Sequence, residues 1–183
     1  MTVCLVLGGA GCVWDDVEAA LGLGEFHGVV ACNDAGAAWP GRLDAWVSLH
    51  GEKMGLWSAR RARAGYEPCT RLVGHLEARP GRKGPFVTEA TEFRFPGQSG
   101  TGSSGLFALK VALVDLGFDK AVLCGVPMTA ATGHFFDPAD WRGASSHWRG
   151  WIEALPHIND RTRSMSGRTA DLLGRPDEEW LAA

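Results

Sequence analysis

The sequence lacks any pair of cysteines spaced for a zinc site or a disulfide framework. Its five cysteines are an odd number, and no CxxC motif occurs among them. Cys4, Cys32 and Cys124 lie inside apolar runs, where a free thiol behaves as a small hydrophobe. Unpaired, buried cysteines are typical of a reducing compartment, so we expect a cytoplasmic protein.

Long hydrophobic runs and a targeting leader are missing as well. Segment 1–9 carries no basic residue and turns into glycine after a short apolar run, which is not the pattern of a signal peptide. No apolar run approaches the roughly 20 residues that a membrane-spanning helix needs. We therefore expect no membrane partner.

A strong excess of charge of one sign is also absent. The net charge of −3 gives no general attraction to polyanions, so no specific nucleic-acid binding is expected. Segment 60–83 is a local exception, with seven Arg and Lys residues against two Glu. This segment is either an ordinary solvated surface or a flap that faces a phosphate.

Two nucleotide-binding motifs are incomplete. Segment 97–104 nearly spells the P-loop GxxxxGK[ST], but Ser103 takes the place of the lysine that reaches the outer phosphates. The first glycine loop has Gly9 and Gly11, but Trp14 stands where GxGxxG requires its third glycine. An ordinary P-loop NTPase is therefore not expected, and the first loop alone does not predict a dinucleotide site.

What the sequence does contain is a regular alternation of short apolar runs and helical patterns. Continuous apolar runs separated by helices predict strands buried on both faces, hence a Rossmann-like α/β sandwich with a mostly parallel central sheet. Strands are expected at 3–7, 29–32, 45–49, 70–73, 92–95 and 121–124. The length of 183 residues suits a single domain, 1–183. We expect 1–128 to form a nucleotide-binding core and 129–183 an aromatic flap with C-terminal helices; a homo-oligomer is compatible with this organisation.

A loop rich in glycine and serine comes directly before a helix expected over 104–116. That helix is apolar on most sides, which predicts burial, and it ends at Gly117, a usual left-handed cap position. The start of a helix presents free backbone N–H groups that favour an anion. The loop therefore predicts a phosphate cradle, or simply a turn in which Ser103 or Ser104 caps the helix.

Small or polar residues follow each expected strand. In an open parallel sheet, ligands bind beyond the carboxyl ends of the strands, so these residues are expected to share one edge and to bind a nucleotide. They are Gly8, Gly9, Gly11, Asn33, Asp34, Ser48, His50, Ser103, Ser104, Gly105, Pro127 and Met128. His50, together with Glu52 and Lys53, is expected either to line this pocket or merely to open a helix.

Candidate catalytic residues lie in an aromatic segment, 134–151. His134 and His147 are expected as general bases, although a histidine among aromatics is also typical of a packed core. Asp137 is the third candidate catalytic group, and together with Asp140 it predicts either a divalent-ion site or a turn. No metal or other cofactor is clearly implied.

Taken in order, the glycine loop, "CND", "WVSLH" and "GSSGLFALKVALVDLGFDKAVLCGVPM" resemble the DUF115/MptE-like (6-hydroxymethylpterin diphosphokinase-like) proteins. They also resemble the family 42 sialyltransferases, which have a Rossmann-like fold, while the closing "SMSGRTADLLGRPDEEWL" is similar to uncharacterised phage and prophage proteins.

This resemblance implies that segment 8–11, Asn33 and Ser104-Gly105 hold a nucleotide. It aligns Trp151 with the family's catalytic histidine, and Trp148 with a phosphate-binding tyrosine.

The sequence thus predicts a protein that binds a nucleotide or nucleotide-activated donor, such as a nucleotide sugar, and that acts as a glycosyl- or phosphoryl-transferase of phage type. Two alternatives stay open. One is a protein that sequesters a nucleotide without turning it over. The other is a phage structural or assembly protein on an enzyme-like fold.

Overall fold

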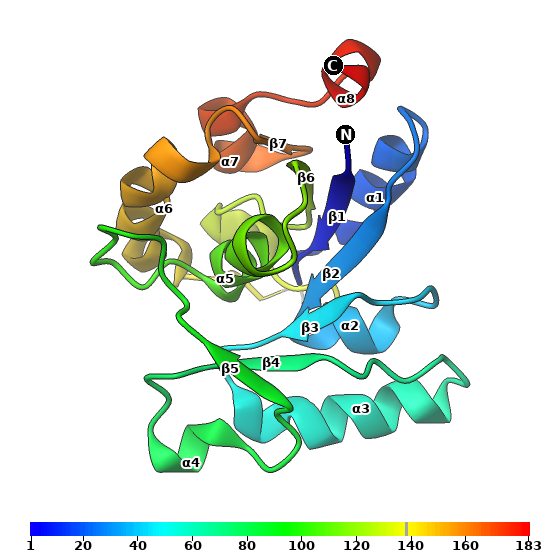
Figure 1. Cartoon of the computed structure of the whole chain (residues 1–183), viewed down its shortest axis with the longest axis vertical. Coiled ribbons are helices and arrows are strands. Elements are labelled where there is room, and N and C mark those ends of the chain that lie inside the picture. Colours follow the sequence, from blue (N-terminus) through cyan, green and yellow to red (C-terminus); the bar gives the residue numbers. More distant parts are fainter. Residues whose placement is uncertain (138) are drawn as a thin grey trace.

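A single parallel sheet forms the centre of the molecule. The computed structural model describes residues 1–137 and 139–183. Seven strands lie in the order β5-β4-β3-β2-β1-β6-β7, and all six pairings between neighbours are parallel (Figure 1). The strands are β1 (Val3–Leu7), β2 (Gly28–Cys32), β3 (Ala45–Val47), β4 (Leu72–His75), β5 (Glu89–Thr91), β6 (Lys120–Cys124) and β7 (Thr162–Ser164). The predicted Rossmann-like α/β fold is confirmed.

Helices cover both faces of this sheet. They are α1 (Val13–Leu21), α2 (Asp34–Ala38), α3 (Met54–Arg63), α4 (Pro80–Lys83), α5 (Ser104–Lys110), α6 (Ala144–Ile158), α7 (Gly167–Leu173) and α8 (Glu178–Ala182), with short turns η1 (Gly51–Lys53), η2 (Val111–Asp115) and η3 (Ala130–Thr132). Alternate residues of a strand point to opposite faces. Leu5 accordingly packs with α1, α2 and α3, whereas its neighbour Val6 packs with α5 and α6.

The side of β1 on which new strands are added to the sheet changes between β5 and β6. From β1 each new strand is added on one side as far as β5, and the chain then returns to place β6 on the other side of β1. The register pairs Leu7 with Cys124, so the two strands end level with each other. In open α/β sheets such a switch point is where the crevice for a ligand forms.

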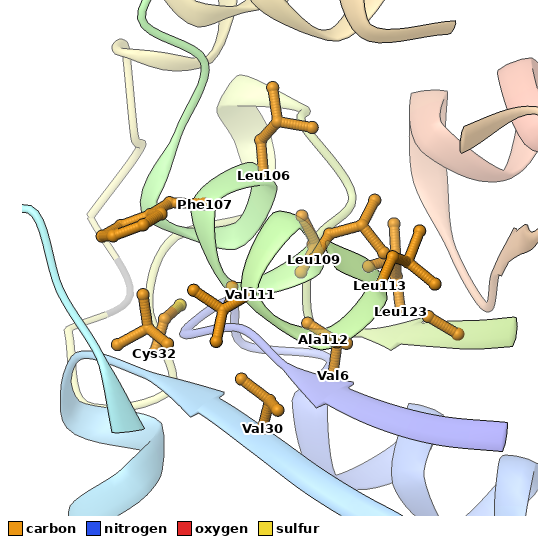
Figure 2. Close-up of a cluster of buried hydrophobic side chains, with 14 of the residues drawn as sticks. Val6, Val30, Cys32, Leu106, Phe107, Leu109, Val111, Ala112, Leu113 and Leu123 are labelled. Carbon is orange, nitrogen blue, oxygen red and sulfur yellow. The ribbon is translucent and has the colours of Figure 1, made fainter. Parts of the chain in front are cut away.

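The helix after the glycine-serine loop is as buried as its sequence predicts. Side chains of α5 and η2 pack against Val6, Val30, Cys32 and Leu123 of the sheet (Figure 2). Its last turn is π-helical, because the Leu116 N–H bonds to the Val111 carbonyl five residues back, at 2.9 Å. Gly117 then ends the helix with a φ of 72°, as expected.

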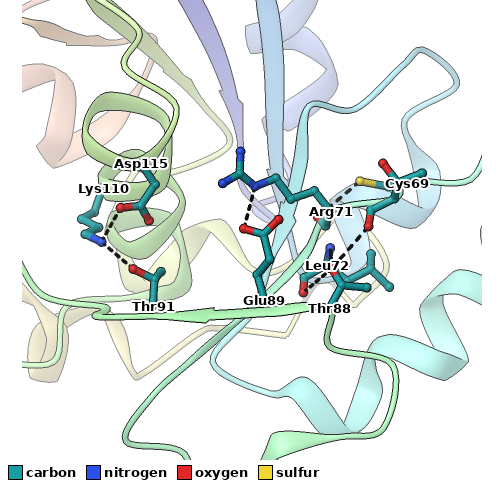
Figure 3. A network of polar contacts seen from close by, with 9 residues as sticks. Cys69, Arg71, Leu72, Thr88, Glu89, Thr91, Lys110 and Asp115 are labelled. Carbon is teal, nitrogen blue, oxygen red and sulfur yellow. Dashed lines mark hydrogen bonds and ion pairs between the residues drawn. The ribbon is translucent and has the colours of Figure 1, made fainter.

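The strand predicted at 92–95 is wrong. The sheet's edge strand is instead β5, held to β4 by polar side chains (Figure 3). Arg71 pairs with Glu89 at 2.8 Å, and the Thr88 hydroxyl accepts the Leu72 N–H at 2.9 Å. The side chains of Phe93 and Phe95 are buried all the same. The Phe95 backbone N–H donates to the Gln98 side-chain oxygen at 3.0 Å and therefore does not pair with a strand.

Residues after 128 complete the sheet and part of the core. β7 pairs with β6, and α6 buries Trp151 fully. In the described part of the chain, no helix is long and apolar enough to cross a membrane.

Candidate functional site

A cavity of about 290 Å³ lies at the carboxyl ends of β1, β2, β3 and β6, beside the start of α5. Its lining includes twelve of the fifteen residues that the sequence singles out. They are Gly8, Gly9, Asn33, Asp34, His50, Ser103, Ser104, Gly105, Pro127, Met128, His134 and His147. Gly11, Ser48 and Asp137 do not line it.

The first glycine loop is held against the loop after β6. The Gly8 N–H bonds to the Cys124 carbonyl at 2.7 Å, and a Cβ on Gly8 would stand 2.2 Å from the Gly125 carbonyl oxygen. A side chain at position 8 would therefore separate the two strand ends at the switch point. Gly11 lies outside the cavity, where its N–H bonds to the Gly133 carbonyl at 3.3 Å.

Behind these loops, the buried carboxylate of Asp16 fixes the loop after β6. It accepts the Gly125 N–H at 2.8 Å and the Ser166 hydroxyl at 2.7 Å. This role is missed at the sequence level, where an aspartate in the first turn of a helix indicates only a favourable charge at that terminus.

Asn33, directly after β2, is held in an unusual conformation. Its φ of 51° and ψ of −133° are strained for a residue with a Cβ. Its Oδ1 accepts from the Ser48 hydroxyl at 2.7 Å, and that hydroxyl accepts the His50 N–H at 2.8 Å. In the described part of the chain, the amide NH₂ of this cavity-lining residue has no protein partner. Ser48 is fully buried and acts through Asn33.

The residues after β3 give one side of the cavity a positive character. His50 contacts Glu52 at 3.3 Å and also the Arg82 guanidinium. Burial, and then the Arg82 charge, lower the pKa of His50. Lys53 lines the cavity, and among the described residues no carboxylate pairs with it. Asp34, also in the lining, is paired with Arg60 at 2.9 Å.

The glycine-serine loop both caps α5 and lines the cavity. Ser103 is the N-cap, and its hydroxyl accepts the Leu106 N–H at 3.4 Å. The Ser104 hydroxyl has no protein partner within the described residues. A Cβ on Gly105 would meet Val126 at 2.8 Å. The capping role and the lining role are thus divided between neighbouring serines.

Helix α6 fixes this loop from outside. The Glu153 carboxylate accepts the backbone N–H groups of Ser99 and Gly100, each at 2.7 Å, and pairs with Arg149 at 2.6 Å. These bonds, led by that from Gly100, lower the pKa of Glu153 to about 2. The backbones of the loop and of α6 lie so close that a Cβ on Gly100 would be 2.8 Å from the Gly150 nitrogen.

The two candidate histidines are held differently. His134 places Nδ1 3.2 Å from the Gly9 carbonyl oxygen, and its backbone bridges to Ala10. If Nδ1 carries the proton donated to that carbonyl, Nε2 is left free. His147 places Nδ1 3.2 Å from the Thr101 hydroxyl and stacks on Trp141, with ring centroids 5.9 Å apart. Burial lowers the pKa of His147.

Asp137 forms a turn outside the cavity. It exchanges backbone hydrogen bonds with His134, and its carboxylate accepts the Ala139 N–H at 3.1 Å. Pro138, within the predicted 137–140 turn, lies outside the described residues. Among those that are described, no group of three or more His, Cys, Asp or Glu residues is arranged to hold a metal ion.

Several lining residues escape the sequence-level prediction. Trp57 is one of them: it lies four residues after Lys53, and this spacing also fits an ordinary amphipathic helix. Lys53 itself lines the cavity, which is the first of the two roles expected for it together with His50. Phe136 and Trp141 belong to the predicted aromatic segment but were not distinguishable there from packing residues.

The two tryptophans singled out by the resemblance are packing residues. Trp151 is fully buried, and its indole N–H has no partner in the described structure. Trp148 does not line the cavity; it packs on the core, and Arg168 lies 4.0 Å from its ring centroid.

No family model matches the chain, and no curated protein matches it. Among solved structures, one similarity is to the MAf glycosyltransferase from Magnetospirillum magneticum AMB-1, at 16% identity and a TM-score of 0.49. The match covers 70% of this chain and 23% of that one. The chain thus spans less than a quarter of that structure's length.

Proposed function

We propose that the cavity at the carboxyl edge of the sheet binds a nucleotide or a nucleotide-activated donor. The observation that carries this proposal is the convergence of lining residues from four strand ends at the switch point. The free amide of Asn33, the hydroxyl of Ser104 and the ammonium of Lys53 supply donors for phosphate and sugar oxygens. The resemblance to DUF115/MptE-like proteins and family 42 sialyltransferases agrees with such a ligand.

A transferase reaction needs a group that moves a proton, and His134 is the better candidate for it. Its orientation by the Gly9 carbonyl frees Nε2, the nitrogen that a general base uses. His147 is anchored by the glycine-serine loop, so its expected role is to position that loop. Asp137 is proposed only as a support for the turn that carries His134.

Binding is tested by thermal stability in the presence of nucleotides and nucleotide sugars. At least one should raise the melting temperature, and Gly105→Val should abolish that rise, because a side chain there closes on Val126 and the cavity. Ser104→Ala should weaken binding by about 0.5–3 kcal/mol. Gly81→Val is the matched control, since Gly81 has nothing within 4 Å, does not have a left-handed φ and lies outside the lining. A ligand that stabilises the wild type and Gly105→Val equally would contradict the proposal.

A second candidate function is nucleotide sequestration without turnover. It is favoured by the burial of Trp151, which the resemblance aligns with a catalytic histidine. Turnover of the stabilising ligand separates the two functions. For a transferase, His134→Ala should lower turnover by about 10²–10⁴ with little loss of affinity. Binding without turnover of any donor would leave the sequestering function.

A further inference from the structure

The cavity has two chemically different ends, and this inference about them rests on the proposed function. One end is cationic and comes from the connection after β3. The other is aromatic and comes from the segment after β6 together with the start of α6.

The cationic end is built around Lys53. Its neighbour Glu52 is engaged by His50 at 3.3 Å and by Arg82 at 3.9 Å. The nearby carboxylate of Asp34 is engaged by Arg60. The acidic groups on this side therefore have basic partners of their own, and in the described chain Lys53 has none. An unpaired ammonium at a cavity wall favours an anionic group of a ligand.

The aromatic end is a connected series of rings. His134 stacks on Phe136 with centroids 5.2 Å apart and planes 3° from parallel, and it also meets Trp141 at 6.0 Å. Phe136 lines the cavity and is 55% exposed, so much of its ring is uncovered on the cavity wall. A planar ligand ring packed on this series would cover that surface.

The sheet order sets the distance between the two ends. His134 lies against Gly9, after β1, whereas Lys53 follows β3, and β2 lies between these strands. Two strand spacings amount to about 10 Å, the length scale of a nucleoside phosphate. Asn33, which follows β2, presents its free amide between the ends.

We infer that a nucleoside phosphate lies across the strand ends, with its base against Phe136 and His134 and its phosphate at Lys53, about 10 Å from His134. In this orientation His134 holds the base and does not reach the phosphate, so the inference belongs with the sequestering function rather than with the transferase. The Asn33 amide then donates to the sugar or to the ester oxygens between them. The ligand is thereby assigned a direction as well as a class.

The test dissects the ligand and the two ends together. Calorimetric affinities are measured for CMP, UMP, AMP and GMP, for the matching nucleosides and for ribose 5-phosphate, with Lys53→Gln and Phe136→Leu. Lys53→Gln should weaken the monophosphates and ribose 5-phosphate about tenfold or more and leave the nucleosides unchanged. Phe136→Leu should weaken the nucleosides and monophosphates about fivefold or more and leave ribose 5-phosphate unchanged.

Matched controls and a second readout keep the test decisive. Lys83→Gln and Phe86→Leu change exposed residues outside the lining, and Phe86 is 55% exposed like Phe136. If the fragments bind too weakly to measure, the salt dependence of monophosphate binding decides instead. It should be reduced by Lys53→Gln and kept by Phe136→Leu.

The reverse pattern, or equal losses for every probe in both variants, would overturn this inference while nucleotide binding stands. Should the wild type bind no nucleotide at all, the proposed function itself fails and the inference with it.

Discussion

At the scale of single residues, backbone strain is concentrated at the cavity. Within the described chain, two non-glycine residues have positive φ, Asn33 at 51° and Met128 at 53°, and both line it. Such conformations cost about 1–3 kcal/mol and persist where surrounding contacts enforce them. For Asn33 those contacts are the Ser48 hydroxyl and the Trp46 indole, which donates to the Asn33 carbonyl at 2.7 Å.

This strain can be measured by comparing two substitutions. Asn33→Gly and Asn33→Ala both remove the side-chain amide, but only glycine relieves the backbone. Asn33→Gly should therefore be more stable to urea than Asn33→Ala by about 1–3 kcal/mol, while both bind nucleotide more weakly than the wild type. Equal free energies of unfolding for the two variants would show that the backbone at position 33 is relaxed.

For some residues of the candidate site, the position in the chain alone decides the place in the fold. Gly8 and Asn33 directly follow β1 and β2, and His50 comes three residues after the end of β3, so a parallel sheet brings them to one edge. Ser48 also follows β3, but its side chain turns toward Asn33 and does not line the cavity. Which way a side chain points after the last paired residue depends on loop geometry, and composition does not encode it.

At the scale of elements, α6 and the glycine-serine loop behave as one unit joined by Glu153. The bonds to this carboxylate hold it ionised, with a pKa of about 2 against an ordinary 4.5. A depressed pKa contributes stability that is present above the ordinary pKa and is lost as the pH falls toward the folded value. The loop should therefore loosen between about pH 4.5 and pH 2.

The test compares Glu153→Gln with the wild type in urea across this range. The stability difference between the two should be constant above about pH 5 and should shrink as the pH falls toward 2. Glu18→Gln serves as control, because Glu18 is exposed on α1 and takes part in no described ion pair. A difference that does not change with pH would contradict the role assigned to the Glu153 charge.

Elements with strong patterns were predictable, and those shaped by tertiary contacts were not. The apolar helix after Ser104 and its end at Gly117 follow from composition. Its π-helical turn does not, although Lys110 and Asp115, five residues apart, form a partly buried ion pair there at 2.7 Å (Figure 3). The misplaced edge strand has a similar cause: Phe93 and Phe95 are buried by packing under α5, not by pairing in the sheet.

At the scale of the whole molecule, the order of the strands creates the site. Alternating strands and helices predict a parallel sheet, but they do not say that β6 returns to the side of β1. That return brings the loops after β1 and β6 together, as the contact between Gly8 and Gly125 shows. The sequence therefore predicts which residues follow the strands better than it predicts which strands are neighbours.

Nucleotide binding at the strand ends can be tested by locating the ligand on the protein. Amide chemical shifts of the ¹⁵N-labelled 19.6 kDa chain are followed during titration with CMP, UMP, AMP and GMP in turn. At least one of them should cause saturable shifts concentrated at Gly8, Gly9, Asn33, Gly105 and Gly125, with little change in α8. Shifts concentrated away from the strand ends, or no saturable shifts with any of the four, would contradict nucleotide binding there.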